Sequence, residues 1–494
     1  MIPGPITCGS SLENYFAVYR KNITGQQQKF DTPYGEHTLL YADWTASGRA
    51  YGPIEQYLQQ EILPFVGNTH TTTTVTGTRM SVAYEKAKRI IKSHVNANEQ
   101  DALLFCGSGM TGAVNKLQRL LGLRWADESR EKAVVFVTHM EHHSNHLSWL
   151  ESNATVEIIE ADENGNVSLP HLRSLLERFK HCRNKIAAVT ACSNVTGIYT
   201  PYHHIAALMH QYGGRCFVDF ACAAPYCTID MHPTAGDAYL DAIYFSPHKF
   251  LGGPGTPGIL IFNKKMYHHG VPDHPGGGTV VYSNPWHDRV YIADIEQRED
   301  GGTPPFLQGI KAAMCIRLKE AMGVKNILRR EEELLEIIFQ RAAAIPGLHL
   351  LAPHATQRAG VVSFVADGVP YALFVKLLND KFGIQMRGGC SCAGTYGHWL
   401  LAVDKRASYA IREAILSGDL SGKPGWVRLS VHPTMTNAEI HFIMDAMEAT
   451  MANVVAWRKD YEYDMEANEY YFKGIKNGEQ SVTDSWFDPA NWQE

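Results

Sequence analysis

Residues 186–219 read IAAVTACSNVTGIYTPYHHIAALMHQYGGRCFVD, and this stretch indicates the fold. An apolar run at 186–191 is followed by a helical pattern at 201–212 and by a second apolar run at 216–219. Proline suits the start of that helix, because its missing N–H would have no partner in a first turn. The order strand, helix, strand predicts two parallel strands joined by a crossover helix.

The same alternation continues on both sides of this unit. Further strand candidates lie at 133–138, 155–160, 242–245 and 258–262, with another apolar run at 102–105. Further helical patterns lie at 80–94, 111–121 and 170–179. The sequence therefore predicts an α/β domain with a mostly parallel sheet and helices on its faces.

A different pattern follows the glycine- and proline-rich passage 270–305 and a helical run to about residue 323. It predicts helices at 329–344, 371–382 and 437–457, strands at 360–366 and 426–431, and a glycine- and cysteine-containing loop at 387–397. We interpret this part as a smaller α+β domain. The tail from Asp460 is acidic, rich in tyrosine and weakly periodic, which predicts a surface strap or partial disorder. The predicted divisions are 1–40, 41–323, 324–458 and 459–494.

Composition excludes several classes of protein. The 494 residues are 45% hydrophobic and 19% charged, which is enough apolar surface for folded domains. Forty-five Lys and Arg against 51 Asp and Glu provide no basic excess for nucleic acid or an anionic membrane. With no membrane span or signal segment apparent and ten scattered cysteines, we expect a soluble cytoplasmic protein whose cysteines are mostly reduced.

Three segments could carry chemistry. Residues 106–112, CGSGMTG, follow an apolar run and open a helix, so free N–H groups at the helix start and the hydroxyls of Ser108 and Thr111 could bind a phosphate. The candidate phosphate-binding residues are Ser108, Gly109, Met110 and Thr111, although a plain helix cap would look similar. Asp219 ends an apolar strand, where open α/β sheets place ligands or where a helix cap can stand.

The third segment, 245–255, places Lys249 in an apolar, glycine-rich loop. A partly desolvated lysine has a lowered pKa and can form a Schiff base, whereas a loop lysine is more often a solvated charge. A phosphate cradle, a strand-end acid and a lysine together are what pyridoxal phosphate requires, so we predict this cofactor.

The sequence resembles the class V aminotransferase group of fold-type I pyridoxal phosphate enzymes, most closely its cysteine desulfurase and selenocysteine lyase branch. The resemblance covers about 41–446 and implies a sheet of the seven-stranded type plus a smaller C-terminal domain joined by the first 40 residues. Segment 246–249, SPHK, implies that Ser246 and His248 lie at the cofactor and that Lys249 binds it covalently. Segment 140–145, MEHHSN, implies that His142 stacks on the cofactor ring.

The resemblance implies further cofactor contacts. Asn194 corresponds to an asparagine near the phenolic oxygen and the substrate, Asp219 to the acid at the pyridine nitrogen, and Thr111 to a phosphate-binding threonine. Thr303, in 301–304 GGTP, resembles a turn that reaches the phosphate of a neighbouring subunit, which implies a homodimer. Cys222 stands where many members carry glutamine, which removes a usual hydrogen-bond donor.

The cysteine loop carries the resemblance to the second group of cysteine desulfurases. Residues 387–393, RGGCSCA, resemble the Arg-x-Gly-x-x-Cys-Ala loop, which implies that Cys392 accepts sulfur and that Arg387 contacts the substrate. Arg428, in 426–430 WVRLS, resembles the arginine that binds the substrate carboxylate. Cys390 is a second cysteine that better-known members lack, and a sulfur relay or redox role for it is a hypothesis.

The function implied is removal of sulfur or selenium from L-cysteine or L-selenocysteine, giving L-alanine and a persulfide on Cys392, with a sulfur-acceptor protein as a further partner. The alternatives are a class V aminotransferase, a C–S lyase acting on another amino acid, and a non-catalytic scaffold that keeps the fold. Metal ligation is a further alternative reading of two groups, which are Cys390, Cys392 and His398, and His142, His143 and His146. Neither group includes enough suitable partners for a structural zinc site, so we predict no metal.

Overall fold

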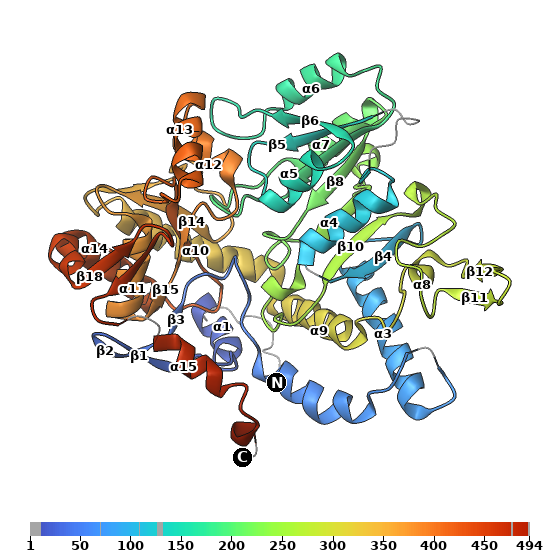
Figure 1. Cartoon of the computed structure of the whole chain (residues 1–494), viewed down its shortest axis with the longest axis horizontal. Coiled ribbons are helices and arrows are strands. Elements are labelled where there is room, and N and C mark those ends of the chain that lie inside the picture. Colours follow the sequence, from blue (N-terminus) through green and yellow to red (C-terminus); the bar gives the residue numbers. More distant parts are fainter. Residues whose placement is uncertain (1–10, 70, 108, 126–131, 476–477, 493–494) are drawn as a thin grey trace.

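A seven-stranded sheet forms the centre of the computed structural model, which describes residues 11–69, 71–107, 109–125, 132–475 and 478–492 (Figure 1). Its strands run in the spatial order β4 (Asp101–Cys106), β10 (Gly258–Asn263), β9 (Ala242–Phe245), β8 (Arg215–Asp219), β7 (Lys185–Thr190), β5 (Ala133–Thr138) and β6 (Ala154–Ile159). All neighbours pair in parallel except β10, which is antiparallel to β4 and to β9. The predicted α/β fold with a mostly parallel sheet is confirmed.

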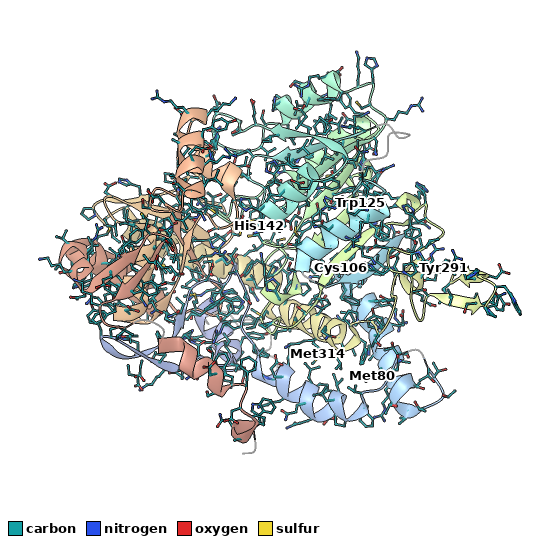
Figure 2. The ribbon with its side chains drawn as sticks, in the orientation of Figure 1. Met80, Cys106, Trp125, His142, Tyr291 and Met314 are labelled. Carbon is teal, nitrogen blue, oxygen red and sulfur yellow. The ribbon has the colours of Figure 1, made fainter. Side chains whose placement is uncertain are left out.

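Helices bury both faces of this sheet, as the near-continuous apolar strands predict. Alternate side chains of β5 show this, because Val134 and Phe136 join one apolar cluster whereas Val135 and Val137 join another. The helices of this part are α2 (Gly52–Tyr57), α3 (Val75–His94), α4 (Gly109–Leu120), α5 (His143–Leu150), α6 (Leu169–Arg178), α7 (Tyr202–Gln211), α8 (Ile295–Arg298) and α9 (Phe306–Met322). Between β10 and α8, the hairpin β11 (Val280–Ser283) and β12 (Arg289–Tyr291) projects from the body, with Tyr291 near one edge and His142 near the middle of Figure 2.

A second, antiparallel sheet follows, in the order β13 (Leu348–Leu350), β14 (Val361–Ala366), β17 (Trp426–Ser430) and β16 (Arg387–Gly389). Its helices are α10 (Val324–Ala342), α11 (Tyr371–Phe382), α12 (Gly394–Leu400), α13 (Lys405–Leu416) and α14 (Asn437–Trp457). Helix α10 begins before the predicted start at residue 329, because Gly323, at φ +75°, turns the chain directly from α9 into α10. The predicted loop at 387–397 is shorter, since β16 and α12 occupy its two ends.

The described segments before α2 and after α14 form further elements outside the two main sheets. Helix α1 (Leu12–Arg20) is followed by the hairpin β1 (Lys29–Thr32) and β2 (Gly35–Thr38), and then β3 (Leu40–Tyr41) pairs in parallel with β15 (Ile384–Gln385). The tail is more regular than its weak periodicity predicted, because it forms the hairpin β18 (Tyr461–Asp464) and β19 (Glu469–Phe472) and helix α15 (Gly478–Ser485). The domain boundaries themselves stay predictions. No helix in the described part of the chain combines the length and the apolar composition that crossing a bilayer requires.

Candidate active site

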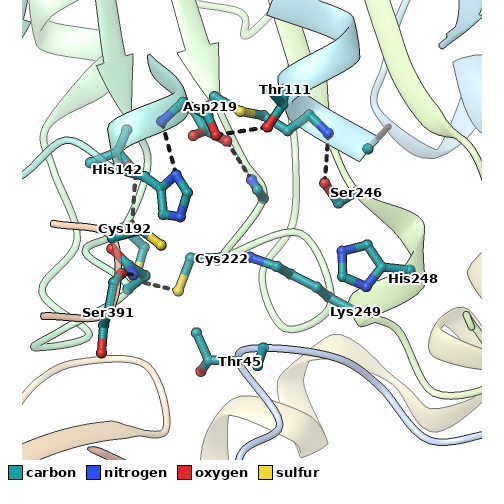
Figure 3. Close-up of a pocket in the computed structure, with 18 of the residues that line it drawn as sticks. Thr45, Thr111, His142, Cys192, Asp219, Cys222, Ser246, His248, Lys249 and Ser391 are labelled. Carbon is teal, nitrogen blue, oxygen red and sulfur yellow. Dashed lines mark hydrogen bonds between the residues drawn. The ribbon is translucent and has the colours of Figure 1, made fainter. Parts of the chain in front are cut away.

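A cavity of about 410 Å³ opens at the carboxyl ends of the parallel strands, where open α/β sheets bind ligands (Figure 3). Thr190 ends β7, Asp219 ends β8, and Ser246 follows β9 directly. The second sheet contributes to the same cavity through Arg428 of β17 and Cys392 of the cysteine loop. The site therefore combines residues from both sheets.

One end of the cavity has groups that suit a phosphate. Helix α4 begins there at Gly109, whose φ of +58° favours glycine, and its first-turn N–H groups point out of the helix end. Ser246 Oγ accepts the Met110 N–H at 2.8 Å, while Thr111 Oγ1 and Ser144 Oγ lie 2.7 Å apart. These hydroxyls and the helix N-terminus form a polar cradle for an anion.

Asp219 and His142 line the deeper part of the cavity. Burial raises the pKa of Asp219 to about 6, although the Ala221 N–H, 2.8 Å from Oδ1, and the charge of Lys249 oppose that shift. His142 Nδ1 accepts the Ser144 N–H at 3.1 Å, so its Nε2 carries the proton in the neutral ring. Burial and then the charge of Lys249 lower the pKa of His142 to about 3, which keeps the ring neutral near pH 7.

Lys249 ends the short 3₁₀ turn Pro247–Lys249 that follows β9, and its side chain points into the cavity toward Cys222 in Figure 3. Burial lowers the pKa of the Lys249 ammonium, partly opposed by the nearby Cys222 and Asp219. The loop leaves no room at Gly253, where a Cβ atom would lie 2.0 Å from the Pro247 carbonyl oxygen. A tightly folded turn thus holds Lys249 in an environment that favours its neutral amine.

Cys222 and Cys192 lie side by side in the cavity wall, with their Sγ atoms 3.8 Å apart. The hydrogen bond between these two thiols lowers the pKa of Cys222, and the charges of Lys249 and Arg428 act in the same direction. Cys222 therefore places a polarisable, more readily ionised sulfur where many members of the resembling family carry a neutral amide.

The cysteine loop has an unusual backbone. Ser391 and Cys392 adopt φ values of +50° and +56°, a left-handed conformation that costs free energy in residues other than glycine. Asn194 Nδ2 donates a hydrogen bond to the Ser391 carbonyl at 2.7 Å. The His143 N–H donates to the Cys392 carbonyl at 2.7 Å, and His143 Nε2 accepts the Gly394 N–H at 2.9 Å. These three hydrogen bonds hold the loop in place.

Two arginines of the second sheet, Arg387 of β16 and Arg428 of β17, line the cavity near Cys392. Arg387 Nη2 is 4.0 Å from Cys392 Sγ. Arg428 is 2% exposed, donates to the Asn194 carbonyl at 3.1 Å, and pairs with Asp43 at 2.6 Å. Arg428 Nε has no partner among the described residues, so this guanidinium keeps one donor for a ligand.

The cavity brings together most of the residues that the sequence predicted. The predicted residues that line it are Gly109, Met110, Thr111, His142, Asn194, Asp219, Cys222, Ser246, His248, Lys249, Arg387, Cys392 and Arg428. Ser108 lies outside the described residues. Thr303 is exposed and does not line the cavity of its own chain, so its predicted contact across a dimer stays a prediction.

Sequence reasoning missed several lining residues. They are Thr45, Ala46, Ser144, Thr190, Cys192, Ala221 and Ser391. Thr45 and Ala46 come from the segment after β3, far from α4 along the chain, and no local pattern marks them. Ser144 and Ser391 each lie close in sequence to a predicted residue, so their position along the chain was the available signal.

The histidines and cysteines that could have suggested a metal have other contacts. His146 Nδ1 lies 3.1 Å from Thr395 Oγ1, and the two ring nitrogens of His398 contact the Gly394 carbonyl and Ser408 Oγ. Among the described residues, no three His, Cys, Asp or Glu side chains are arranged so that they could hold a metal ion.

Comparison with known proteins places this fold and site in a class. The family model for aminotransferase class V matches residues 40–443, and the chain belongs to that family. Among curated relatives, probable cysteine desulfurases of Staphylococcus aureus and Staphylococcus epidermidis are each 28% identical over 379 residues, which is 76% of this chain and 88% of theirs.

Solved structures share the fold. A cysteine desulfurase of Thermococcus onnurineus matches with a TM-score of 0.71 and 21% identity, covering 88% of this chain and 98% of that one. A cysteine desulfurase of Escherichia coli matches with a TM-score of 0.69 and 19% identity, and the match again covers 88% of this chain and 98% of that one. At these identities the structures support the architecture, whereas function has to be argued from the site.

Proposed function

We propose that this protein is a pyridoxal phosphate-dependent cysteine desulfurase, which removes sulfur or selenium from L-cysteine or L-selenocysteine. The products are L-alanine and a persulfide on Cys392. The observation that carries the proposal is that Cys392 lines the same cavity as Lys249. An aminotransferase or C–S lyase has no need for a cysteine held at that position.

The residues present fit pyridoxal phosphate. Thr45 Oγ1, Asn194 Oδ1 and Ser391 Oγ are buried polar atoms without a partner among the described residues, and all three residues line the cavity. A buried unpaired polar atom costs about 1–3 kcal/mol, so a polar ligand that pairs with these atoms would be favoured. The α4 N-terminus with Ser246 and His248 would hold the phosphate, and Asp219 the ring nitrogen.

When bound, the cofactor would supply an electron-withdrawing ring, as it does throughout this class of enzymes. Asp219 must be ionised to hold a protonated ring nitrogen, and its pKa of about 6 leaves it ionised at neutral pH. Neutral His142 can lie against an aromatic face without the cost of desolvating a charge. Asn194 can hydrogen-bond to a polar ring substituent.

Lys249 acts as the base that removes the proton from the substrate α-carbon. Its pKa is lowered by burial, so a larger share of Lys249 is the neutral amine that can accept that proton. Arg428, with its free Nε donor, binds the substrate carboxylate, and Arg387 lies beside the reacting sulfur. Cys392 as a thiolate attacks the substrate sulfur, so a new S–S bond forms and the bond between that sulfur and the substrate β-carbon breaks. The carbon skeleton keeps the electron pair of the broken bond and takes up a proton to become alanine.

We also propose a homodimer in which Thr303 reaches the phosphate of the second subunit. Thr303 is exposed, which leaves it available for such a contact. The persulfide must then pass to an acceptor. The chemistry needs Cys392 as a free thiol, which a reducing compartment such as the cytoplasm maintains.

A substrate panel tests the proposal. The holoenzyme is incubated with L-cysteine and L-selenocysteine, with and without a keto acid, and all amino-acid, keto-acid and sulfur products are quantified. Alanine formed in equal amount with persulfide supports the desulfurase. Amino transfer that depends on the keto acid, or sulfide released together with pyruvate, would instead identify an aminotransferase or a C–S lyase.

A further inference from the structure

A second cavity, of about 600 Å³, lies on the other side of the cysteine loop. Arg387, Ser391 and Cys392 line both cavities, whereas Cys390 lines the second cavity and not the first. Cys392 therefore stands in the partition between the two spaces. Because Cys392 borders both spaces, the second cavity offers an approach to this residue from outside the first cavity.

The outer wall of this second cavity is the C-terminal hairpin, which lies beyond the region matched by the family model. Residues 467–471, at the turn and in β19, line it. The hairpin is anchored on α11, because Tyr461 and Tyr470 form an apolar cluster with Leu373 and Leu377. Tyr461 also donates a hydrogen bond to Asp380 at 2.9 Å.

The hairpin is also linked to the cysteine loop through Tyr371. Asn468 Nδ2 donates to the Tyr371 hydroxyl at 2.5 Å. The Tyr371 ring packs where Gly388 and Gly425 leave space. A Cβ atom would lie 3.0 Å from a ring carbon at Gly388 and 2.5 Å from one at Gly425. The hairpin, α11 and the strand before the cysteines thus form one continuous wall.

The charges in the second cavity favour an anion. Among the described residues, the lining includes three cationic side chains, Arg387, Lys376 and Lys423, and one carboxylate, that of Glu469. The Glu469 carboxylate accepts a hydrogen bond from Tyr471 at 2.7 Å. Lys376 is paired with Asp380 at 3.2 Å. Lys423 is exposed and makes no ion pair within the described part of the chain, so its charge is available to a ligand.

We propose that this second cavity binds the sulfur acceptor, and that the acceptor is a small thiol carrying a carboxylate. This inference rests on the proposed desulfurase function. The three hydrogen bonds at Ser391, Cys392 and His143 hold the loop in place, so an acceptor approaches Cys392 through the second cavity beside it. A volume of about 600 Å³ lies in the range of small-molecule binding sites.

The transfer step balances without an added oxidant or reductant. The acceptor thiolate attacks the outer sulfur of the Cys392 persulfide, and a new S–S bond forms between them. The bond between Cys392 Sγ and that outer sulfur breaks, and Cys392 leaves as a thiolate. The acceptor departs as a persulfide, and Cys392 is ready for the next substrate.

The test separates persulfide formation from persulfide transfer. The holoenzyme is given one equivalent of L-cysteine, and the Cys392 persulfide is then followed by mass spectrometry after addition of mercaptoacetate, 2-mercaptoethanol or cysteamine. The three thiols are compared at equal concentrations of their thiolate forms. We expect saturable transfer to mercaptoacetate, with a half-saturating concentration about fivefold below that of 2-mercaptoethanol, and a smaller difference at high salt.

Two variants and one control locate the effect. Lys423→Gln should raise the half-saturating concentration of mercaptoacetate about threefold to fivefold and leave that of 2-mercaptoethanol unchanged. Ala467→Trp, at an exposed position on the cavity wall, should slow transfer to both thiols. Lys405→Gln removes an exposed lysine that lines neither cavity and should change neither value.

Several results would contradict binding of a small anionic thiol in the second cavity. Transfer that rises linearly with every thiol, or equal effects of Lys423→Gln and Lys405→Gln, would overturn this inference alone. Transfer only to an added acceptor protein would also overturn it. If no persulfide forms on the holoenzyme before thiol is added, the proposed function fails, and this inference fails with it.

Discussion

Asn194 donates a hydrogen bond from Nδ2 to the backbone carbonyl of Ser391 at 2.7 Å. Asn194 lies just beyond β7 of the central sheet, and Ser391 directly precedes Cys392 in the loop after β16. This bond joins the part of the site that would hold the cofactor to the part that would accept sulfur. The position of Cys392 is thereby coupled to the central sheet.

His143 provides a second link to the same loop, and it offers a cleaner test because it does not line the cofactor cavity. His143→Ala removes the acceptor of the Gly394 N–H, so the left-handed loop loses one of its supports. The loss of one hydrogen bond of about 1 kcal/mol should slow persulfide formation about fivefold. Stopped-flow measurement of persulfide formation checks this, and unchanged cofactor absorbance shows that the effect is confined to the loop.

Asp219 predicts a pH dependence of cofactor binding. Burial raises its pKa to about 6, so the carboxyl is ionised at neutral pH and becomes protonated as the pH falls through that value. The neutral acid cannot hold a protonated ring nitrogen, so affinity should fall by up to about tenfold for each pH unit below the Asp219 pKa. Equilibrium titration of the cofactor-free protein with pyridoxal phosphate at a series of pH values measures this affinity. The Asp219→Asn variant should bind the cofactor weakly and should lack the fall in affinity at low pH. The same pH profile in the variant as in the wild type would contradict the role of Asp219 at the ring nitrogen.

Glu299 anchors the glycine- and proline-rich passage that carries Thr303. Its buried carboxylate pairs with Lys116 at 2.9 Å and accepts a hydrogen bond from the Tyr267 hydroxyl at 2.7 Å. Glu299→Ala leaves Lys116 without this partner and should lower the free energy of unfolding by about 3 kcal/mol. Urea denaturation measures the change, with Glu36→Ala, which breaks an exposed pair, as a control that should have a much smaller effect.

Thr303 tests the proposed dimer. If each phosphate is held by two chains, dilution should release cofactor as the dimer dissociates, and Thr303→Ala should weaken cofactor retention without changing Lys249. Size-exclusion chromatography with absorbance detection, over a range of protein concentrations, follows both properties together. A monomer with full cofactor occupancy and activity would show that Thr303 has no such role.

The central site could be predicted because its chemistry lies in short local patterns. Asp219 ends a buried strand and Lys249 follows one, so their places at one edge of a mostly parallel sheet follow from the order of elements. Thr45 could not be predicted, because a turn after β3 brings it to the cavity through tertiary packing alone. The left-handed Ser391 and Cys392 are equally hidden, since neither residue type signals a positive φ.

The C-terminal hairpin shows a second limit of sequence reasoning. Each of its strands has only four residues, too few for a clear alternation of apolar and polar side chains. Its stability comes from Tyr461 and Tyr470 packing on Leu373 and Leu377, which lie far earlier in the chain. A contact of that kind becomes visible only in the folded structure.

The most direct test of the central claim is to map the sulfur after one turnover. The holoenzyme is treated with one equivalent of L-cysteine, alkylated and digested, and the loop peptide is sequenced by mass spectrometry. We predict one extra sulfur on Cys392, its loss together with alanine production in Cys392→Ser, and full persulfide formation in Cys390→Ala, with cofactor absorbance retained in both variants. Alanine produced from L-cysteine at the wild-type rate by Cys392→Ser would contradict the account.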